Sequence, residues 1–172
     1  MEKSAAAAAK AASKGGDTTS AKKTLIDVTE KSIVTADIIA SVASHAAGAT
    51  SVFIGTTRNS FEGKVVVRLE YEAYDSMAKK VIKELVVSAR KRWELMHVSV
   101  VHRTGVVASG EASIVIAASS VHRKEAIAAV EFLINRIKEA VPIWKKEIYT
   151  DGTKWKANKE AHRKPFLPGE AG

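Results

Sequence analysis

The sequence lacks cysteine altogether: none occurs among its 172 residues. This absence excludes a disulfide scaffold, cysteine-ligated zinc and catalysis by a thiolate. It also fits a reducing compartment, so we expect a cytoplasmic protein. A run of about 18 apolar residues is missing too, and without one no membrane span is encoded. If sulfur chemistry takes place on this chain, another molecule must bring the sulfur.

The common templates of catalytic and cofactor sites are also missing. The glycines of the central region stand alone, so the chain has neither a P-loop nor a dinucleotide-binding loop. His97 and His102 are five residues apart on a predicted strand, which places their side chains on opposite faces. No nucleophile-elbow motif is present. We therefore expect neither a metal nor a bound cofactor.

The composition that remains is that of one globular domain with polar ends. Hydrophobic residues make up 46% and charged residues 27%, and 172 residues suffice for one domain but not for two full ones. Residues 1–24 are rich in Ala, Ser, Lys, Gly and Thr, which predicts a disordered tail, with a targeting peptide as the alternative. The predicted domain spans 25–158, and 159–172 form a polar C-terminal tail.

The basic charge is concentrated at the two ends of the chain. The formal net charge of +8 suggests nucleic-acid binding as one interpretation. However, residues 1–24 carry a net +3 and residues 153–172 another +3, whereas the 17 basic and 15 acidic residues of 25–152 leave the middle at +2. A nearly neutral middle argues against a phosphate-binding track on the folded surface.

Hydrophobic periodicity predicts an α+β domain whose helices pack on a mixed, largely antiparallel sheet. The expected strands are at 25–28, 52–55, 64–73, 98–102, 105–107, 112–118 and 143–149. In the third of them, alternation predicts one buried face made of Val65, Val67, Leu69, Tyr71 and Ala73.

Three helices are expected among these strands: one over 35–45, a second from residue 75 and a third from residue 121. Thr35 and Asp75 are suitable N-cap residues, and Gly48 is a suitable stop signal for the first helix. Pro142 should end the third helix, because the residue before a proline is pushed out of the helical region.

Several cations and threonines lie where local structure alone does not explain them. His122 and Arg123 occupy the first turn of the third helix, where the helix dipole favours acids. An anion that used the exposed amides together with the guanidinium would account for them, and the alternative is an arginine that points into solvent. Arg58 follows a strand in a polar loop, beside Thr56 and Thr57.

Two lysines flank the end of the third helix. Lys138 lies in its last turn, where the helix dipole is a sufficient explanation. Lys145 follows Trp144 in an apolar extended stretch. Partial burial beside the indole would make the Lys145 amine a better base or nucleophile.

Several ordered motifs in residues 25–158 resemble the large, catalytic subunit of molybdopterin synthase, and most closely its eukaryotic form, which has a Thr-Thr pair in the first motif. The motifs are Phe53-Ile54-Gly55-Thr56-Thr57-Arg58-Asn59, Leu69-Glu70-Tyr71-Glu72-Ala73-Tyr74, His102-Arg103-Thr104-Gly105, His122-Arg123, and Lys138 with Val141-Pro142-Ile143-Trp144-Lys145-Lys146-Glu147. The fold implied by this resemblance is of the alpha/beta-hammerhead kind.

The resemblance implies a sulfurtransferase of molybdenum cofactor synthesis. Its substrate would be cyclic pyranopterin monophosphate, also called precursor Z, and its product the dithiolene of molybdopterin. The sulfur would come from the C-terminal Gly-Gly thiocarboxylate of a small ubiquitin-like subunit. Two such subunits would assemble around a homodimer of this chain to give a heterotetramer.

The same resemblance assigns roles to individual residues. Lys138 and Lys145 match the catalytic lysines, and we expect them to act as acid and base or as a covalent amine. The positions that match substrate contacts are Thr56, Thr57, Arg58, His122, Arg123, Lys146 and Glu147. Among these, the three cations Arg58, His122 and Arg123 would hold the phosphate and pterin oxygens by charge-assisted hydrogen bonds.

Helix geometry constrains how these residues can share one substrate. Arg123 and Lys138 are 15 residues apart, or about 22 Å along the axis of a continuous helix. A pterin does not easily span that distance, so either the helix is broken, or there are two anion sites, or two copies share the pocket. We favour a pocket shared across a two-fold dimer, in which His122 and Arg123 reach in from the neighbouring copy.

Two other classes of function stay open at this point. A small RNA-binding α+β module would use the basic charge, although the nearly neutral middle argues against it. A non-catalytic scaffold for a ubiquitin-like protein would bind the partner without chemistry.

Overall fold

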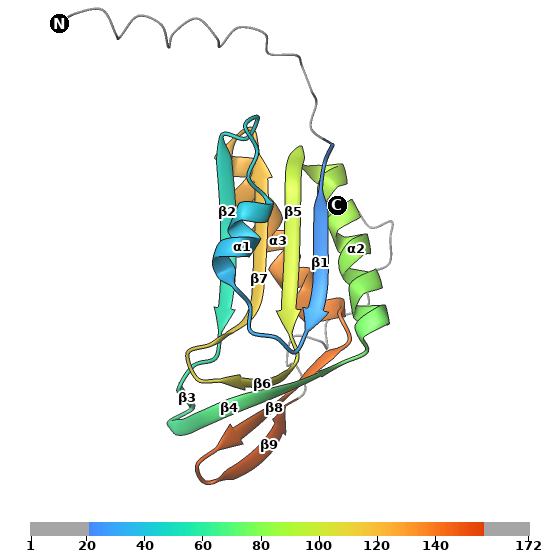
Figure 1. The fold of residues 1–172 in the computed structure, drawn as a ribbon. Coiled ribbons are helices and arrows are strands. Elements are labelled where there is room, and N and C mark those ends of the chain that lie inside the picture. Colours follow the sequence, from blue (N-terminus) through green and yellow to red (C-terminus); the bar gives the residue numbers. More distant parts are fainter. Residues whose placement is uncertain (1–20, 157–172) are drawn as a thin grey trace, which may run out of the picture.

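Two apolar strands form the centre of a four-stranded sheet (Figure 1). The strand order is β1 (Thr24–Thr29), β5 (Leu95–Arg103), β7 (Ala112–Ser120) and β2 (Ala49–Thr56). The β1–β5 pair is parallel and the other two pairs are antiparallel, so the sheet is mixed, as predicted. The computed structural model describes residues 21–156, and the predicted tails 1–24 and 159–172 lie outside this range except for residues 21–24.

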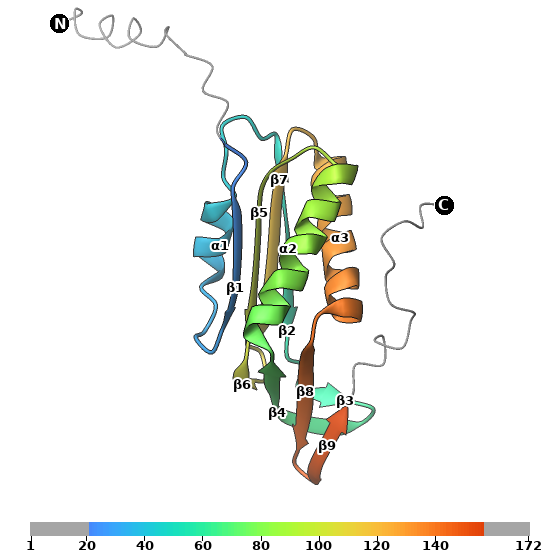
Figure 2. The same ribbon diagram turned by 90° about the vertical axis from the view of Figure 1, so that its right-hand side faces the viewer.

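Helices cover both faces of this sheet (Figure 2). α2 (Asp75–Arg92) and α3 (Arg123–Ala140) lie on one face, and the short α1 (Thr35–Ser41) lies on the other. α3 packs along both β2 and β7. The predicted α+β class is therefore confirmed. α3 ends at Ala140, and Val141, the residue before Pro142, is extended, as the proline predicted.

The central strands are buried on both sides, which explains their continuous apolar runs. In β7, Ile114 and Ile116 belong to the core beneath α2 and α3, whereas Val115 and Ala117 belong to the smaller core beneath α1. Full burial of a side chain such as Ile116 contributes about 1.5–3 kcal/mol to folding.

A second, antiparallel sheet lies across one end of the first (Figure 1). Its strands are β3 (Ser60–Phe61), β4 (Lys64–Ala73), β8 (Ile143–Tyr149) and β9 (Gly152–Lys156) in that order, with β6 (Gly105–Ala108) also paired to β4. The sequence patterns predicted these strands apart from β3 and β9, but not their division into two sheets. Only Val141 and Pro142 separate the end of α3 from the start of β8, so Pro142 redirects the chain from the large sheet to the small one.

The first helix is shorter than predicted, and its caps differ. α1 ends at Ser41, and the N-cap residues of α1 and α2 are Val34 and Tyr74, neither of which makes a side-chain cap hydrogen bond. Gly48 does not stop the helix. A Cβ atom at Gly48 would lie 2.4 Å from the Val121 carbonyl oxygen, so the glycine permits a close approach of two backbones.

The buried face of β4 changes at a bulge. Val66 is 5% exposed, whereas Val65 and Val67 are 55% and 44% exposed, which inverts the predicted face in this part of the strand. The β4–β8 register shifts between Val66 and Arg68, and from Leu69 onward the predicted face is the buried one. One extra residue in a strand moves the following side chains to the other face, and the hydrophobic periodicity of the sequence did not predict this bulge.

The His102 ring closes the junction between the two sheets. It is 7% exposed and packs edge-on against the Tyr71 ring of β4, with the ring centroids 5.2 Å apart. Its Nδ1–H donates to the Arg103 carbonyl oxygen at 2.8 Å. Burial lowers the pKa of His102 from 6.5 to about 4 against the opposing effect of that hydrogen bond, so the imidazole is neutral at pH 7.

We expect this histidine to make the protein less stable in mild acid. In the unfolded chain His102 binds a proton as the pH falls below 6.5, whereas in the folded chain it does not until about pH 4. Between pH 7 and pH 4.5 the free energy of unfolding should therefore fall by about 2.5 kcal/mol through this group. Urea unfolding at the two pH values should show this loss in the wild type but not in His102→Gln. The exposed His45, changed to Gln, serves as the control and should keep the wild-type pH dependence; an unchanged pH dependence in His102→Gln would contradict the assignment.

Candidate active site

A cavity of about 460 Å³ opens where the end of α3 meets the two sheets. Five of the nine site residues predicted from sequence line it: Thr56, Arg58, Lys138, Lys145 and Glu147. They come from the end of β2 and the loop after it, from the last turn of α3, and from β8. Segments far apart in the chain therefore converge on one cavity, and the cations among them make it suitable for an anion.

The two predicted catalytic lysines reach this cavity from either side of Pro142. Lys138 lies in the last turn of α3, and Lys145 lies on β8 directly opposite Tyr71 of β4. Strand alternation places Trp144 on the other face, where its ring packs edge-on against Tyr74. The expected shielding of Lys145 by the neighbouring indole is therefore wrong.

Lys145 has an acidic neighbour instead. Its Nζ lies 3.4 Å from Oε1 of Glu147, two residues along the same strand. Glu147 is 4% exposed, and its Oε2 accepts a hydrogen bond from the Tyr149 hydroxyl. A carboxylate held in this way keeps the Lys145 ammonium at the cavity wall, and Glu147 is thus suited to holding a lysine as well as to touching a substrate.

The loop after β2 contributes a threonine and an arginine to the cavity. Thr56 and Arg58 line it, and the Arg58 guanidinium lies over the Phe61 ring, 5.3 Å from the ring centroid. Thr57, between them, is 3% exposed and lies beside the cavity without lining it. Alternation along an extended segment explains why the middle residue points inward while its neighbours face the opening.

Lys146 lies on the other face of β8. It pairs with Glu70 of β4 in the strand register, and its Nζ lies 3.9 Å from the Glu70 Oε2. Glu70 also accepts from Nε of Arg68 at 2.9 Å. The structure therefore directs Lys146 into a surface charge cluster, away from the cavity that Lys145 lines.

His122 and Arg123 lie at the opposite end of α3 from the cavity. Both are exposed, with His122 as the N-cap and Arg123 as the first helical residue. α3 is one continuous helix from Arg123 to Ala140, which rules out the broken-helix alternative. Within one copy of the chain these two residues do not share a site with Lys138.

A neutral polar floor completes the cavity, and sequence reasoning missed it as part of the site. Tyr71, His102 and Ser113 line it alongside the cationic residues. Burial raises the pKa of Tyr71, the nearby Glu147 charge adds to this, and a hydrogen bond with Ser113 opposes it, so the phenol stays protonated. The available signal was the alternation of the 64–73 strand, which placed Tyr71 on the buried face.

Two negative findings concern residues 21–156, the part of the chain that the structure describes. It contains no group of three or more potential His, Asp or Glu ligands. It also contains no helix that is long and apolar enough to span a bilayer.

Comparisons with known proteins show to which family the chain belongs. A family model described as MoaE protein matches residues 28–140. The molybdopterin synthase catalytic subunit of Taeniopygia guttata is 49% identical over 141 residues, which cover 81% of this chain and 91% of that protein. The catalytic subunit from Homo sapiens is 46% identical over 138 residues, covering 80% and 73%. The crystal structure of molybdopterin synthase from Staphylococcus aureus superposes with a TM-score of 0.73 at 39% identity, covering 76% of this chain and 96% of that one. The chain therefore belongs to the MoaE family.

Proposed function

We propose that the chain is the catalytic subunit of a molybdopterin synthase. It would transfer sulfur from the C-terminal thiocarboxylate of a small ubiquitin-like subunit to cyclic pyranopterin monophosphate, forming the dithiolene of molybdopterin. The observation that carries the proposal is the convergence of Lys138, Lys145 and Arg58 on one cavity. The cysteine-free chain agrees with it, because the sulfur then arrives on the partner. A reducing compartment suits such a chain, and we propose the cytoplasm.

The residues of the cavity divide the chemical work between them. The Arg58 guanidinium would bind the cyclic phosphate or pterin oxygens by charge-assisted hydrogen bonds. Lys138 and Lys145 would move protons, or form a covalent amine adduct, while the thiocarboxylate sulfur attacks the substrate side chain and the phosphate ring opens. Water would then cleave the acyl–sulfur bond, which leaves the sulfur on the substrate and a carboxylate on the small subunit. A second thiocarboxylate would supply the second sulfur of the dithiolene. Glu147 would hold the Lys145 ammonium, and the neutral Tyr71 hydroxyl could donate to a substrate oxygen.

The proposed assembly is a homodimer with two small subunits. The extended Gly-Gly tail of each small subunit would have to enter the cavity to bring its thiocarboxylate near Lys138 and Lys145. His122 and Arg123 would complete the cavity of the neighbouring copy, because α3 carries them away from their own.

The two alternatives make different predictions. An RNA-binding module would retain RNA in a salt-dependent manner. Residues 25–152 carry a net charge of only +2, and three of their cations, Arg58, Lys138 and Lys145, line a cavity. A scaffold would bind the small subunit equally well after loss of both lysines and would never form product.

Replacing either lysine should remove most of the product formation. In an assay with thiocarboxylated small subunit and cyclic pyranopterin monophosphate, Lys138→Ala and Lys145→Ala should each lower the rate of dithiolene formation by about 10²- to 10⁴-fold, as expected for loss of a proton-transfer group. Binding of the small subunit should remain measurable. Lys83→Ala, on the exposed face of α2, is the control and should keep the wild-type rate; full turnover by both cavity variants would refute the assignment.

A shared pocket predicts rescue in hybrid dimers. Arg123→Ala and Lys138→Ala damage different ends of α3, and each uniform dimer should be impaired at both of its sites. When the two variants are unfolded together in equal amounts and refolded, half of the randomly paired dimers are hybrids. Each hybrid has one intact composite site, so about a quarter of all sites are intact. Activity measured well below KM should therefore recover to about a quarter of the wild-type value. Activity no higher than the mean of the two separate variants would argue against sharing.

A further inference from the structure

Arg58 lies on a segment that needs external support. The β2–β7 register shifts between Gly55 and Thr56, so β2 leaves its regular pairing just before Arg58. Arg58 itself is exposed, and its guanidinium rests on the Phe61 ring. A guanidinium binds an oxyanion well only when the backbone that carries it is held in place.

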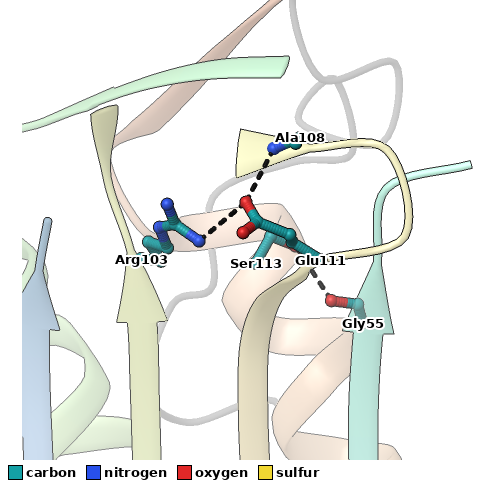
Figure 3. Close-up of polar contacts among 5 residues, drawn as sticks. All are labelled: Gly55, Arg103, Ala108, Glu111 and Ser113. Carbon is teal, nitrogen blue, oxygen red and sulfur yellow. Dashed lines mark hydrogen bonds and ion pairs between the residues drawn. The ribbon is translucent and has the colours of Figure 1, made fainter. Parts of the chain in front are cut away.

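The turn between β6 and β7 provides this support through backbone hydrogen bonds. The Thr57 amide donates to the Glu111 carbonyl oxygen at 3.0 Å, and the Gly110 amide donates to the Thr57 carbonyl oxygen at 2.8 Å. On the other side of the bulge, the Ser113 hydroxyl donates to the Gly55 carbonyl oxygen at 3.1 Å (Figure 3). Both peptide groups of Thr57, the residue before Arg58, are therefore attached to this turn.

The Glu111 side chain holds this turn in place. Its Oε2 accepts from Nη1 of Arg103 at 2.9 Å and from the Ala108 amide at 2.9 Å, so one carboxylate ties the end of β5 to the end of β6 (Figure 3). The hydrogen bond from the Ala108 amide lowers the pKa of Glu111, partial burial opposes this, and the Arg103 charge lowers it further. The carboxylate is therefore ionised when it holds the turn.

Arg103 depends on this carboxylate as well. Its side chain is 13% exposed, and its buried Nε has no hydrogen-bond partner among residues 21–156. Glu111 is thus the acid that orients the Arg103 guanidinium. Without it, the turn loses its tie to β5.

We propose that Glu111 is a positioning residue for Arg58. Its carboxylate, clamped between Arg103 and the Ala108 amide, fixes the turn to which Thr57 is bonded, and so sets where the Arg58 guanidinium meets the anionic substrate. This inference rests on the proposed function, because it takes the anion bound by Arg58 to be the substrate of sulfur transfer.

The test is a double-mutant cycle between Glu111 and Arg58 in the assembled synthase, with cyclic pyranopterin monophosphate as the varied substrate. Glu111→Gln keeps an acceptor for Ala108 but loses the ion pair, and Arg58→Ala removes the group that it positions. Each single variant should raise KM about tenfold, as expected for the loss of one charge-assisted hydrogen bond to the substrate. Its kcat should stay within about twofold of the wild-type value. In the Arg58→Ala background, Glu111→Gln should add no further increase in KM.

The control is another acid with the same two kinds of partner. Asp27 Oδ1 pairs with Lys79 at 2.9 Å and accepts from the Val28 amide at 2.9 Å, but Asp27 does not line the cavity. Asp27→Asn should therefore leave KM unchanged.

Several results would overturn the inference. They are a wild-type KM in Glu111→Gln, an additive KM increase in the double variant, and a loss of kcat alone. If Glu111→Gln does not fold, Arg103→Lys replaces it in the same cycle, with the same expected and opposing results. A wild-type complex that forms no dithiolene refutes the proposed function itself, whereas an active wild type with an unaffected Glu111→Gln refutes only the positioning role.

Discussion

The burial of both faces of β5 and β7 determines where the other elements lie. Because both faces are apolar, α2 and α3 must cover one and α1 the other. α3 then lies along β2 and β7, and its last turn reaches the end of the large sheet. There the chain passes through Pro142 into β8, which pairs with β4, so the small sheet lies across the same end of the large sheet. The cavity is a consequence of this crossing.

The cavity combines cationic walls with a neutral floor. Lys138, Lys145 and Arg58 supply positive charge, while burial keeps His102 and Tyr71 uncharged at neutral pH. An anion placed among these residues meets charge-assisted donors on its flanks and weaker neutral donors beneath. Such an arrangement favours an anionic substrate, because a protonated His102 would repel the neighbouring lysines and an ionised Tyr71 would repel the anion itself.

Periodicity predicted most of the helices and strands, and the family motifs contained the two lysines that line the cavity. Neither predicted how the residues of the site are arranged in space. Alternation predicted β4 and the inward position of Tyr71, but not the bulge after Val66, because a bulge leaves no periodic mark in the sequence. Gly48 resembled a helix stop, yet its role depends on a backbone carbonyl more than seventy residues later in the chain. The motif that contains Lys145 also contains Lys146, and only the strand register separates the residue that lines the cavity from the one that pairs with Glu70.

The most direct test of the account is to map where the substrate binds. Cyclic pyranopterin monophosphate is titrated into ¹⁵N-labelled protein, and amide chemical shifts are followed by NMR. We expect saturable changes at the end of β2, at the end of α3 and along β8, together with changes at His122 and Arg123 contributed by the neighbouring copy. Changes confined to other surfaces, or none at substrate concentrations that support turnover, would contradict it.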